Sequence, residues 1–217
     1  MKKIKGIMAG MAAFAMMVSL AACGGSAPAA ESKSAASEST AAAESAAAES
    51  TAVAESTAAH AEVLVAFFSA TGTTKGVAER IAAVTGGDLY EIVPAEPYTD
   101  EDLNYNDSST RATMEQDDKN ARPEIGSEDI SLEGYTTVYL GFPIWWGEEP
   151  RILDTFVEKY DFEGITVVPF CTSGGSGIGR SGPNMEALAG SGTWLKGERL
   201  SAGVSEDEIR SWIEGLN

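Results

Sequence analysis

Residues 62–74, EVLVAFFSATGTT, decide the fold of this chain, because they join an uninterrupted apolar run to a turn rich in hydroxyl groups. The run EVLVAFF (62–68) has the length and composition of a strand that is covered on both faces. Beyond the turn, residues 77–84 repeat apolar side chains at the spacing of one helical face. Gly86-Gly87 ends this helix, and Leu89–Val93 has the pattern of a second strand. The stretch therefore predicts a βαβ unit.

The same alternation of strand and helix continues to the end of the chain. Two more apolar runs predict buried strands, and each precedes a helical pattern. A short fifth strand and a last helix, opened by a capping box of Ser205 and Glu208, complete the series. The predicted strands are residues 136–142, 165–170 and 193–200, and the helices start near residues 150, 183 and 205. Residues 61–217 are thus expected to form one α/β domain, a three-layer, doubly wound fold around a parallel five-stranded sheet.

One long polar stretch, residues 94–132, interrupts this alternation. Its middle, residues 108–120, predicts a short helix capped by Asp107 or Ser108. Loops of this length are either functional or disordered, and the large side chains of Tyr98, Tyr105 and Met114 argue against plain disorder. The stretch could therefore build or block one side of a binding site.

The first sixty residues have the composition of a targeting segment and a spacer. Residues 1–22 carry three lysines and then an apolar run that is too short for the ~20 residues of a membrane span, which predicts a signal peptide. Cys23 directly after Leu-Ala-Ala resembles the lipobox of bacterial lipoproteins. The resemblance implies that Cys23 is acylated, and that the chain is secreted and held on the outer face of a bacterial cell membrane. An inert cysteine in an ordinary signal peptide is the alternative. Residues 24–60, rich in Ala, Ser and Glu, are expected to be a disordered tether.

The composition excludes several classes of function. The chain has 217 residues with 33 acidic against 15 basic side chains, a net charge of −18, so it has few cations with which to bind nucleic acid. The single histidine, His60, ends the tether, which leaves the folded domain without His for a Ser-His-Asp triad or a His-bearing metal site. Cys171 is expected to be a small packing group. We expect neither a catalytic side chain nor a bound metal, and therefore chemistry that a cofactor supplies.

Three segments that directly follow predicted strands have distinct chemical characters. In a doubly wound sheet, ligands bind at the carboxyl ends of the strands, where the strand order reverses. The hydroxyl-rich turn at residues 69–74 suits a phosphate monoester, although it could be a helix start with spare hydroxyls. The loop at residues 143–147 offers Trp145 and Trp146 as a wall for a planar ring, although both could simply cover the sheet end. The segment at residues 172–177 offers bare backbone for close approach to a ring edge.

Together these three motifs resemble flavodoxin-like proteins, in particular the bacterial branch with a Trp-Trp loop and a Thr-Ser-Gly-Gly-Ser loop. The resemblance covers essentially all of residues 62–217 and implies the strand order 2-1-3-4-5 and bound FMN. The resemblance implies that residues 69–74 hold the phosphate of FMN, and that the loop at 143–147 and the segment at 172–177 flank its isoalloxazine ring. Trp146 is the preferred stacking residue, with Trp145 second. The candidate FMN-binding residues are Ser69, Ala70, Thr71, Gly72, Thr73, Thr74, Pro143, Ile144, Trp145, Trp146, Thr172, Ser173, Gly174 and Gly175.

Three functions are compatible with this interpretation. The favoured one is an electron carrier, tethered to a membrane through its lipid alone, that exchanges electrons with redox partner proteins or small quinone-type acceptors. The second is a two-electron, NAD(P)H-dependent quinone or flavin reductase, which needs an open face over the flavin ring. The third is a flavin-free interaction module on the same scaffold.

Overall fold

The computed structural model describes residues 62–216. The predicted signal peptide, Cys23, the tether and His60 lie outside these residues, so those predictions stay predictions. Among the helices that the structure describes, none is long and apolar enough to cross a membrane.

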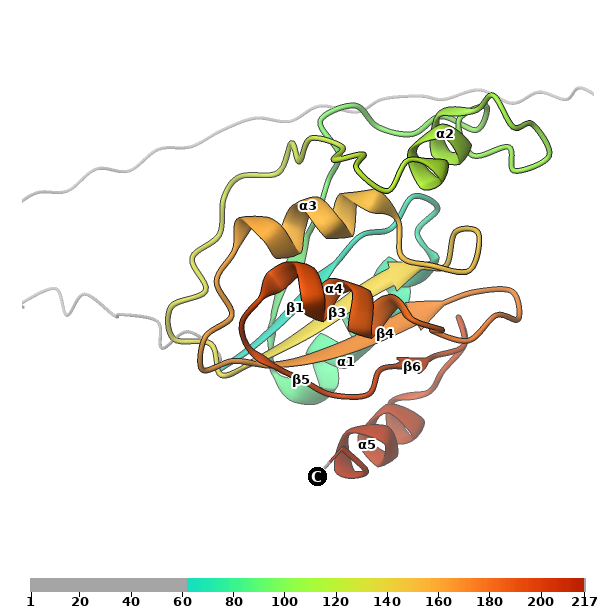
Figure 1. The fold of residues 1–217 in the computed structure, drawn as a ribbon. Helices are drawn as coiled ribbons and strands as arrows, with labels where there is room; N and C mark the ends of the chain where they lie inside the picture. Colours follow the sequence, from blue (N-terminus) through green and yellow to red (C-terminus); the bar gives the residue numbers. More distant parts are fainter. Residues whose placement is uncertain (1–61, 217) are drawn as a thin grey trace, which may run out of the picture. The chain divides into compact units, whose positions relative to one another are not determined.

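Strands and helices alternate along the described chain in the predicted order (Figure 1). The strands are β1 (Val63–Phe67), β2 (Asp88–Glu91), β3 (Thr137–Pro143), β4 (Thr166–Thr172), β5 (Thr193–Trp194) and β6 (Glu198–Arg199). The helices are α1 (Thr73–Thr85), α2 (Arg111–Asp117), α3 (Arg151–Lys159), α4 (Ser181–Ala189) and α5 (Glu206–Glu214).

The strands form one parallel sheet in the order β2-β1-β3-β4-β5, which confirms the predicted doubly wound topology. In the middle of the sheet, β1 pairs with both β2 and β3, so that Leu64 faces Asp88 on one side and Val138 on the other. The chain moves outward from β1 to β2 and then returns to β3. The strand order therefore reverses between β1 and β3, and a crevice is expected outside their carboxyl ends.

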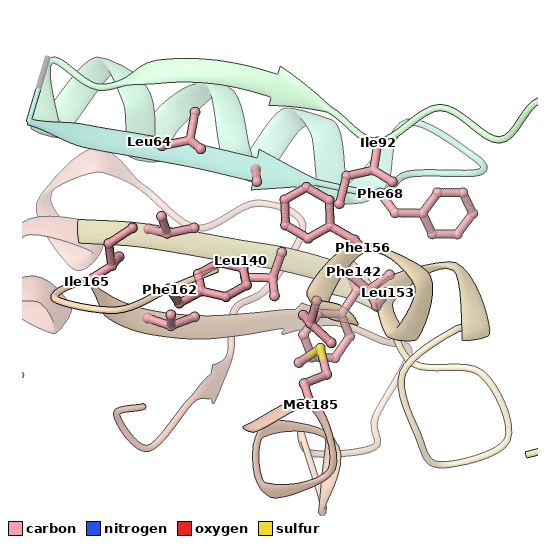
Figure 2. Close-up of a cluster of buried hydrophobic side chains, with 14 of the residues drawn as sticks. Leu64, Phe68, Ile92, Leu140, Phe142, Leu153, Phe156, Phe162, Ile165 and Met185 are labelled. Carbon is pink, nitrogen blue, oxygen red and sulfur yellow. The ribbon is translucent and has the colours of Figure 1, made fainter. Parts of the chain in front are cut away.

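Alternate residues of the strands enter two separate cores, one on each face of the sheet. On β1, Leu64 belongs to the core under α3 and α4, whereas Val65 belongs to the core under α1 and α5. Figure 2 shows the first of these, with Phe142 of β3, Phe156 of α3 and Met185 of α4. Burial on both faces explains why the strands appear in the sequence as continuous apolar runs.

The fifth strand position is divided between two short strands, a difference from the single predicted strand over residues 193–200. Both β5 and β6 pair with β4, where Val167 faces Trp194 and Phe170 faces Glu198. Between these two pairs, the edge strand has one residue more than β4, so the edge strand contains a β-bulge. It lies beside Pro169, which has no backbone N–H to donate to the ladder.

Helix α2 begins later and is shorter than predicted, and neither Asp107 nor Ser108 caps it. Thr110 occupies the N-cap position without a side-chain hydrogen bond. Asp107 instead accepts bonds from the backbone N–H and the hydroxyl of Ser109 (2.8 and 2.7 Å), which closes a local turn ahead of the helix. Helix α5 has the predicted capping box of Ser205 and Glu208.

Candidate functional site

The turn after β1 places hydroxyl groups at the start of α1. Gly72 has a left-handed backbone conformation (φ 82°), which turns the chain from the strand into the helix. Thr74 is buried, and its Oγ1 lies 2.9 Å from Oγ1 of Thr172 at the end of β4. The Oγ of Ser69 is buried and has no hydrogen-bond partner in the part of the chain that is described. Because buried polar atoms are nearly always paired, this hydroxyl indicates a place for a ligand atom.

Backbone groups at the start of α1 add further donors. The first N–H groups of a helix have no intrahelical partner, and the positive end of the helix dipole attracts anions. No side chain among residues 62–216 caps this helix start at Gly72. Lys75 is exposed, and its ammonium group forms an ion pair with Glu91 (Nζ to Oε2, 2.7 Å). The turn can therefore bind a phosphate through N–H and hydroxyl groups, without a cation.

The two tryptophans after β3 have different environments. Trp145 packs edge-on against Phe68 and Tyr98, with ring centroids 5.5 and 5.1 Å away. Trp146 has a positive φ of 48° and leaves 44% of its surface exposed. Trp145 thus covers the end of the sheet, whereas Trp146 is presented toward solvent.

The third predicted segment, residues 172–177, lies at the same edge of the sheet. The register pairs Pro143 with Thr172, and the backbone N–H of Ile144 donates to the Thr172 carbonyl (3.0 Å). The hydroxyl of Ser173 donates to the Ser176 carbonyl and closes a small turn. Gly174 is exposed, and the space where a Cβ would stand is open. Gly175 has the same open surroundings, so bare backbone is available here as predicted.

A cavity of about 370 Å³ brings two of the three segments together. Its lining residues are Ser69, Ala70, Thr71, Thr74, Leu103, Tyr105, Ala112, Pro143, Ile144, Trp145 and Trp146. Eight of these are candidate residues from the sequence. Gly72, Thr73 and the residues of the third segment border the same sheet edge but do not line the cavity. The cofactor-binding roles of all these residues stay predictions.

The long polar stretch was expected to build or block one side of a site, but the residues by which it forms the third wall of the cavity were not predicted from the sequence. Leu103, Tyr105 and Ala112 come from the long polar stretch between β2 and β3, in which no motif marks them. The available signal was compositional, because Tyr105 is a large ring within a run of small polar residues. Sequence spacing alone could not show that this distant stretch folds back over the ends of β1 and β3.

Aromatic and ionic contacts attach this wall to the sheet. Tyr98 packs on Trp145 and donates its hydroxyl to Glu115 of α2 (2.5 Å). The guanidinium of Arg111 lies over the Tyr98 ring, 4.2 Å from its centroid, and Arg111 Nε bonds Glu115 Oε1 at 2.7 Å. Burial raises the pKa of the Tyr98 hydroxyl, so it stays protonated and continues to donate. These contacts hold α2 against the Trp145 side of the cavity.

Comparison with known protein families identifies the family to which this fold and cavity belong. Residues 62–216 match the family model described as flavodoxin, and this match spans the whole described fold. The chain belongs to the flavodoxin family. Its sheet order and the crevice at the ends of β1 and β3 are those of a flavodoxin-like fold. A search of curated proteins finds no match.

Two of the solved structures that resemble the flavodoxin domain are more than 40% identical to it in sequence. A protein of Bacteroides eggerthii described as a flavoprotein is 44% identical and covers 71% of this chain and 96% of its own, with a TM-score of 0.67. One of Bacteroides uniformis, described in the same way, is 42% identical over 71% of this chain and 99% of its own, with a TM-score of 0.68. A Lactobacillus acidophilus flavoprotein solved in complex with FMN is 23% identical over 70% of this chain and 97% of its own. Its TM-score of 0.54 shows a shared fold.

Behind the tryptophan loop, the flavodoxin domain buries a cluster of charged side chains. Arg151 bonds Glu148 (3.0 Å) and approaches Asp154 (3.4 Å), and its guanidinium also donates to the Gln116 carbonyl at the end of α2 (3.1 Å). Burial raises the pKa of Asp154 to about 6, helped by the negative charge of Glu149. Burial likewise raises the pKa of Glu149. The cluster connects α2, α3 and the loop that carries Trp146.

Cys171 does not line the cavity. Cys171 is fully buried, and burial raises the pKa of its thiol to about 12, which fits the predicted packing role. Among residues 62–216, no group of His, Cys, Asp and Glu is arranged to hold a metal ion. The expected absence of a resident metal stays a prediction.

Proposed function

We propose that this flavodoxin is an FMN-binding electron-transfer protein that a lipid at Cys23 holds on the outer face of a bacterial cell membrane. The assignment of FMN rests on one observation. The buried hydroxyl of Ser69, just before α1, has no hydrogen-bond partner among the described residues, and it lies in the same cavity as the exposed ring of Trp146. One end of the cavity thus suits a phosphate, and the other suits a planar ring. FMN combines these two groups in one molecule.

The residues of the cavity would divide the binding of FMN between them. The hydroxyls of Ser69, Thr71 and Thr73 and the N–H groups at the start of α1 would donate hydrogen bonds to the phosphate oxygens. Trp146 would stack on the isoalloxazine ring, while the backbone of Gly174 and Gly175 would approach its edge. FMN supplies reversible transfer of one or two electrons, and the protein holds the ring, tunes it and shields it from water.

The cavity favours a carrier over an enzyme. Among its lining residues, Tyr105 is the single ionisable side chain, and no carboxylate, lysine or histidine lines it. A reductase that passes a hydride and a proton to a quinone benefits from a positioned acid or base near the ring. A carrier needs no such group. Its acidic surface would dock basic redox partners by electrostatic steering.

The visible spectrum of the purified full chain tests the cofactor assignment. We expect a yellow protein, or a colourless one that turns yellow when FMN is added. A chain that cannot be reconstituted with FMN would leave only the flavin-free interaction module. Reduction in two resolved one-electron steps supports the carrier, whereas rapid oxidation of NAD(P)H with a quinone acceptor supports the reductase.

The anchor has its own test, since it depends on the sequence before the described residues. Intact mass spectrometry of the chain from membranes should show an acylated Cys23 as the first residue. The variant Cys23→Ser should appear in the soluble fraction and keep its FMN. An unmodified Cys23, or a Cys23→Ser chain that stays with the membrane, would contradict the lipid anchor.

A further inference from the structure

The loop that carries Trp146 is a tight two-residue turn. The backbone N–H of Trp145 donates to the Glu148 carbonyl (3.0 Å), and the N–H of Glu148 donates back to the Trp145 carbonyl (3.1 Å). The two residues between them, Trp146 and Gly147, both have a positive φ, 48° and 88°, which the type I′ turns of β-hairpins require. The exposed ring of Trp146 therefore projects from a short turn, and its direction depends on how Glu148 is held.

Arg151 holds Glu148 from outside the cavity. It is the first residue of α3 and is buried. Its Nη2 atom donates to Oε2 of Glu148 (3.0 Å) and to the carbonyl of Gln116 near the end of α2 (3.1 Å). Gln116 in turn donates its Nε2 to the carbonyl of Glu149 (3.1 Å). Two sets of hydrogen bonds thus join the end of α2 to residues 148 and 149, which end the tryptophan turn.

This connection joins two walls of the cavity but does not line it. Trp146 lines the cavity from the turn and Ala112 lines it from α2, whereas Gln116, Glu148 and Arg151 are absent from its lining. Residues four apart lie one above the other on a helix, so holding Gln116 also holds Ala112. The connection therefore sets the distance between the two walls.

The guanidinium of Arg151 has the geometry that such a connection needs. It is planar and presents several donors in fixed directions, whereas a lysine presents one compact charge. While Nη2 bonds the turn and α2, Nη1 lies 3.4 Å from Oδ2 of the buried Asp154. Buried ion pairs contribute little net stability, and their best-attested use is to specify one geometry among several. The arrangement thus favours a role in positioning.

We propose that Arg151 is a positioning residue for the flavin: by holding Glu148 against the end of α2, it fixes the direction of the Trp146 ring and the distance between two walls of the cavity. This inference rests on the proposed function and adds to it a residue that lies outside the cavity. The effect of Arg151 falls on the binding of the ring, because the phosphate turn after β1 makes no contact with this connection among the described residues.

The test is the variant Arg151→Lys in the full chain. Lysine keeps the charge that compensates the buried carboxylates, but one ammonium group cannot bridge Glu148, Gln116 and Asp154 in the same way. We expect the Kd to rise about 3- to 10-fold, as for a weakened stacking contact, and equally for FMN and for riboflavin, which has the ring without the phosphate. The fluorescence of the bound flavin, which a stacked tryptophan quenches, should increase.

Arg122→Lys is the matched control, because Arg122 belongs to the same charged cluster. Two of its N–H groups bond Glu158 (2.8 and 2.7 Å), and it approaches Asp154 (3.7 Å). Within residues 62–216, none of its hydrogen bonds or ion pairs reaches the turn at 145–148. Arg122→Lys can lower the melting temperature, but we expect it to keep the Kd for both flavins and the fluorescence of the wild type.

Glu148→Ala breaks the same connection from its other end and decides the question if Arg151→Lys does not fold. The side chain of Glu148 is 32% exposed, so its loss should cost the free protein little stability. We expect the same rise in Kd for both flavins. In the double variant the rise should not exceed that of the stronger single variant, because both substitutions remove one shared interaction.

The contrary results point to different errors. If the wild-type chain binds neither flavin, the proposed function fails and this inference fails with it. If the wild type binds FMN and Glu148→Ala keeps both Kd values within about twofold, only the role of Arg151 is overturned. That role is also overturned if Arg122→Lys loses as much affinity as Arg151→Lys, or if FMN binding weakens and riboflavin binding does not.

Discussion

At the scale of single residues, the two adjacent tryptophans have opposite tasks. Trp145 is held by two edge-on aromatic contacts, with Phe68 and Tyr98, and so contributes to the stability of the domain. Trp146 makes no aromatic contact among the described residues and has a backbone conformation (φ 48°) that is unfavourable for a bulky side chain. Such local strain is typical of functional positions, where a ligand recovers the cost.

The variant Trp146→Gly tests this division of tasks. Glycine removes the ring and also relieves the positive φ, so we expect FMN affinity to fall by about 1–3 kcal/mol while the free protein becomes more stable by up to about 1 kcal/mol. Titration with FMN and thermal unfolding without FMN measure the two effects. The matched variant Trp145→Ala should instead lower the melting temperature. Unchanged FMN affinity in Trp146→Gly would show that the ring does not stack on the flavin.

Ser69→Ala tests the unpartnered hydroxyl. Because Oγ of Ser69 has no partner among the described residues, its removal should cost the free protein almost no stability. If it binds the phosphate of FMN, affinity should fall by about 1.5–3 kcal/mol, the range for a hydrogen bond to a charged group. Riboflavin, which lacks the phosphate, serves as the control ligand. Its affinity should be the same for Ser69→Ala and the wild type, and equal losses for both ligands would contradict the assignment.

At the scale of elements, the placement of α2 explains how the cavity acquires its third wall. The chain from β2 to β3 folds back over the carboxyl ends of the strands and is held there at two points. Tyr98 and Arg111 attach it to the Trp145 side, and Gln116 and Arg151 attach it to α3. The second attachment depends on buried charges, so its strength depends on pH.

The raised pKa of Asp154 predicts in which direction the stability of the domain changes with pH. Its folded pKa, about 6, is higher than the ordinary value of 3.8, so between these two pH values the folded state binds more protons than the unfolded state. Its contribution to stability therefore increases as the pH falls from about 6 to about 4, by about 1–3 kcal/mol in total. Unfolding by urea at several pH values measures this. In Asp154→Asn the free energy of unfolding should change less over that interval, and an unaltered pH profile would contradict the shifted pKa.

Much of the domain follows from local sequence, and the reasons for the exceptions are physical. Strands buried on both faces leave continuous apolar runs, and this is why β1, β3 and β4 were predictable within one or two residues. The bulge opposite Pro169 depends on a missing N–H on the neighbouring strand, which no pattern within residues 193–200 reveals. Tyr105 was recognisable as a large ring, but its place in the cavity depends on contacts of Tyr98 and Arg111 that join distant parts of the chain.

At the scale of the whole molecule, charge is concentrated in the folded part. Residues 61–217 carry 28 acidic and 11 basic side chains, a formal net charge of −17 out of the −18 of the chain. A surface of one sign accelerates encounter with partners of the other sign and slows encounter with its own. The proposed carrier should therefore select basic redox proteins.

Ionic strength distinguishes the two kinds of electron acceptor. The second-order rate constant with a basic redox protein should fall about 10-fold or more between 10 mM and 500 mM salt, because the Debye length shrinks from about 30 Å to a few Å. The rate constant with a small neutral quinone should stay nearly constant. Stopped-flow measurements of FMN oxidation provide both values, and equal salt dependence for the two acceptors would contradict steering by the acidic surface.

Glu62 and the cavity lie at opposite ends of the central strands. The carbonyl of Glu62 accepts the backbone N–H of Thr136 (2.8 Å) at the amino ends of β1 and β3, whereas the cavity opens at their carboxyl ends. The five residues of β1 separate the two places by about 17 Å. Glu62, the first described residue, therefore lies on the side of the domain away from the cavity. For the lipid anchor proposed at Cys23, shortening the sequence between Cys23 and Glu62 should therefore reduce the volume that the domain searches for partners, and should leave the affinity for FMN and its redox potential unchanged.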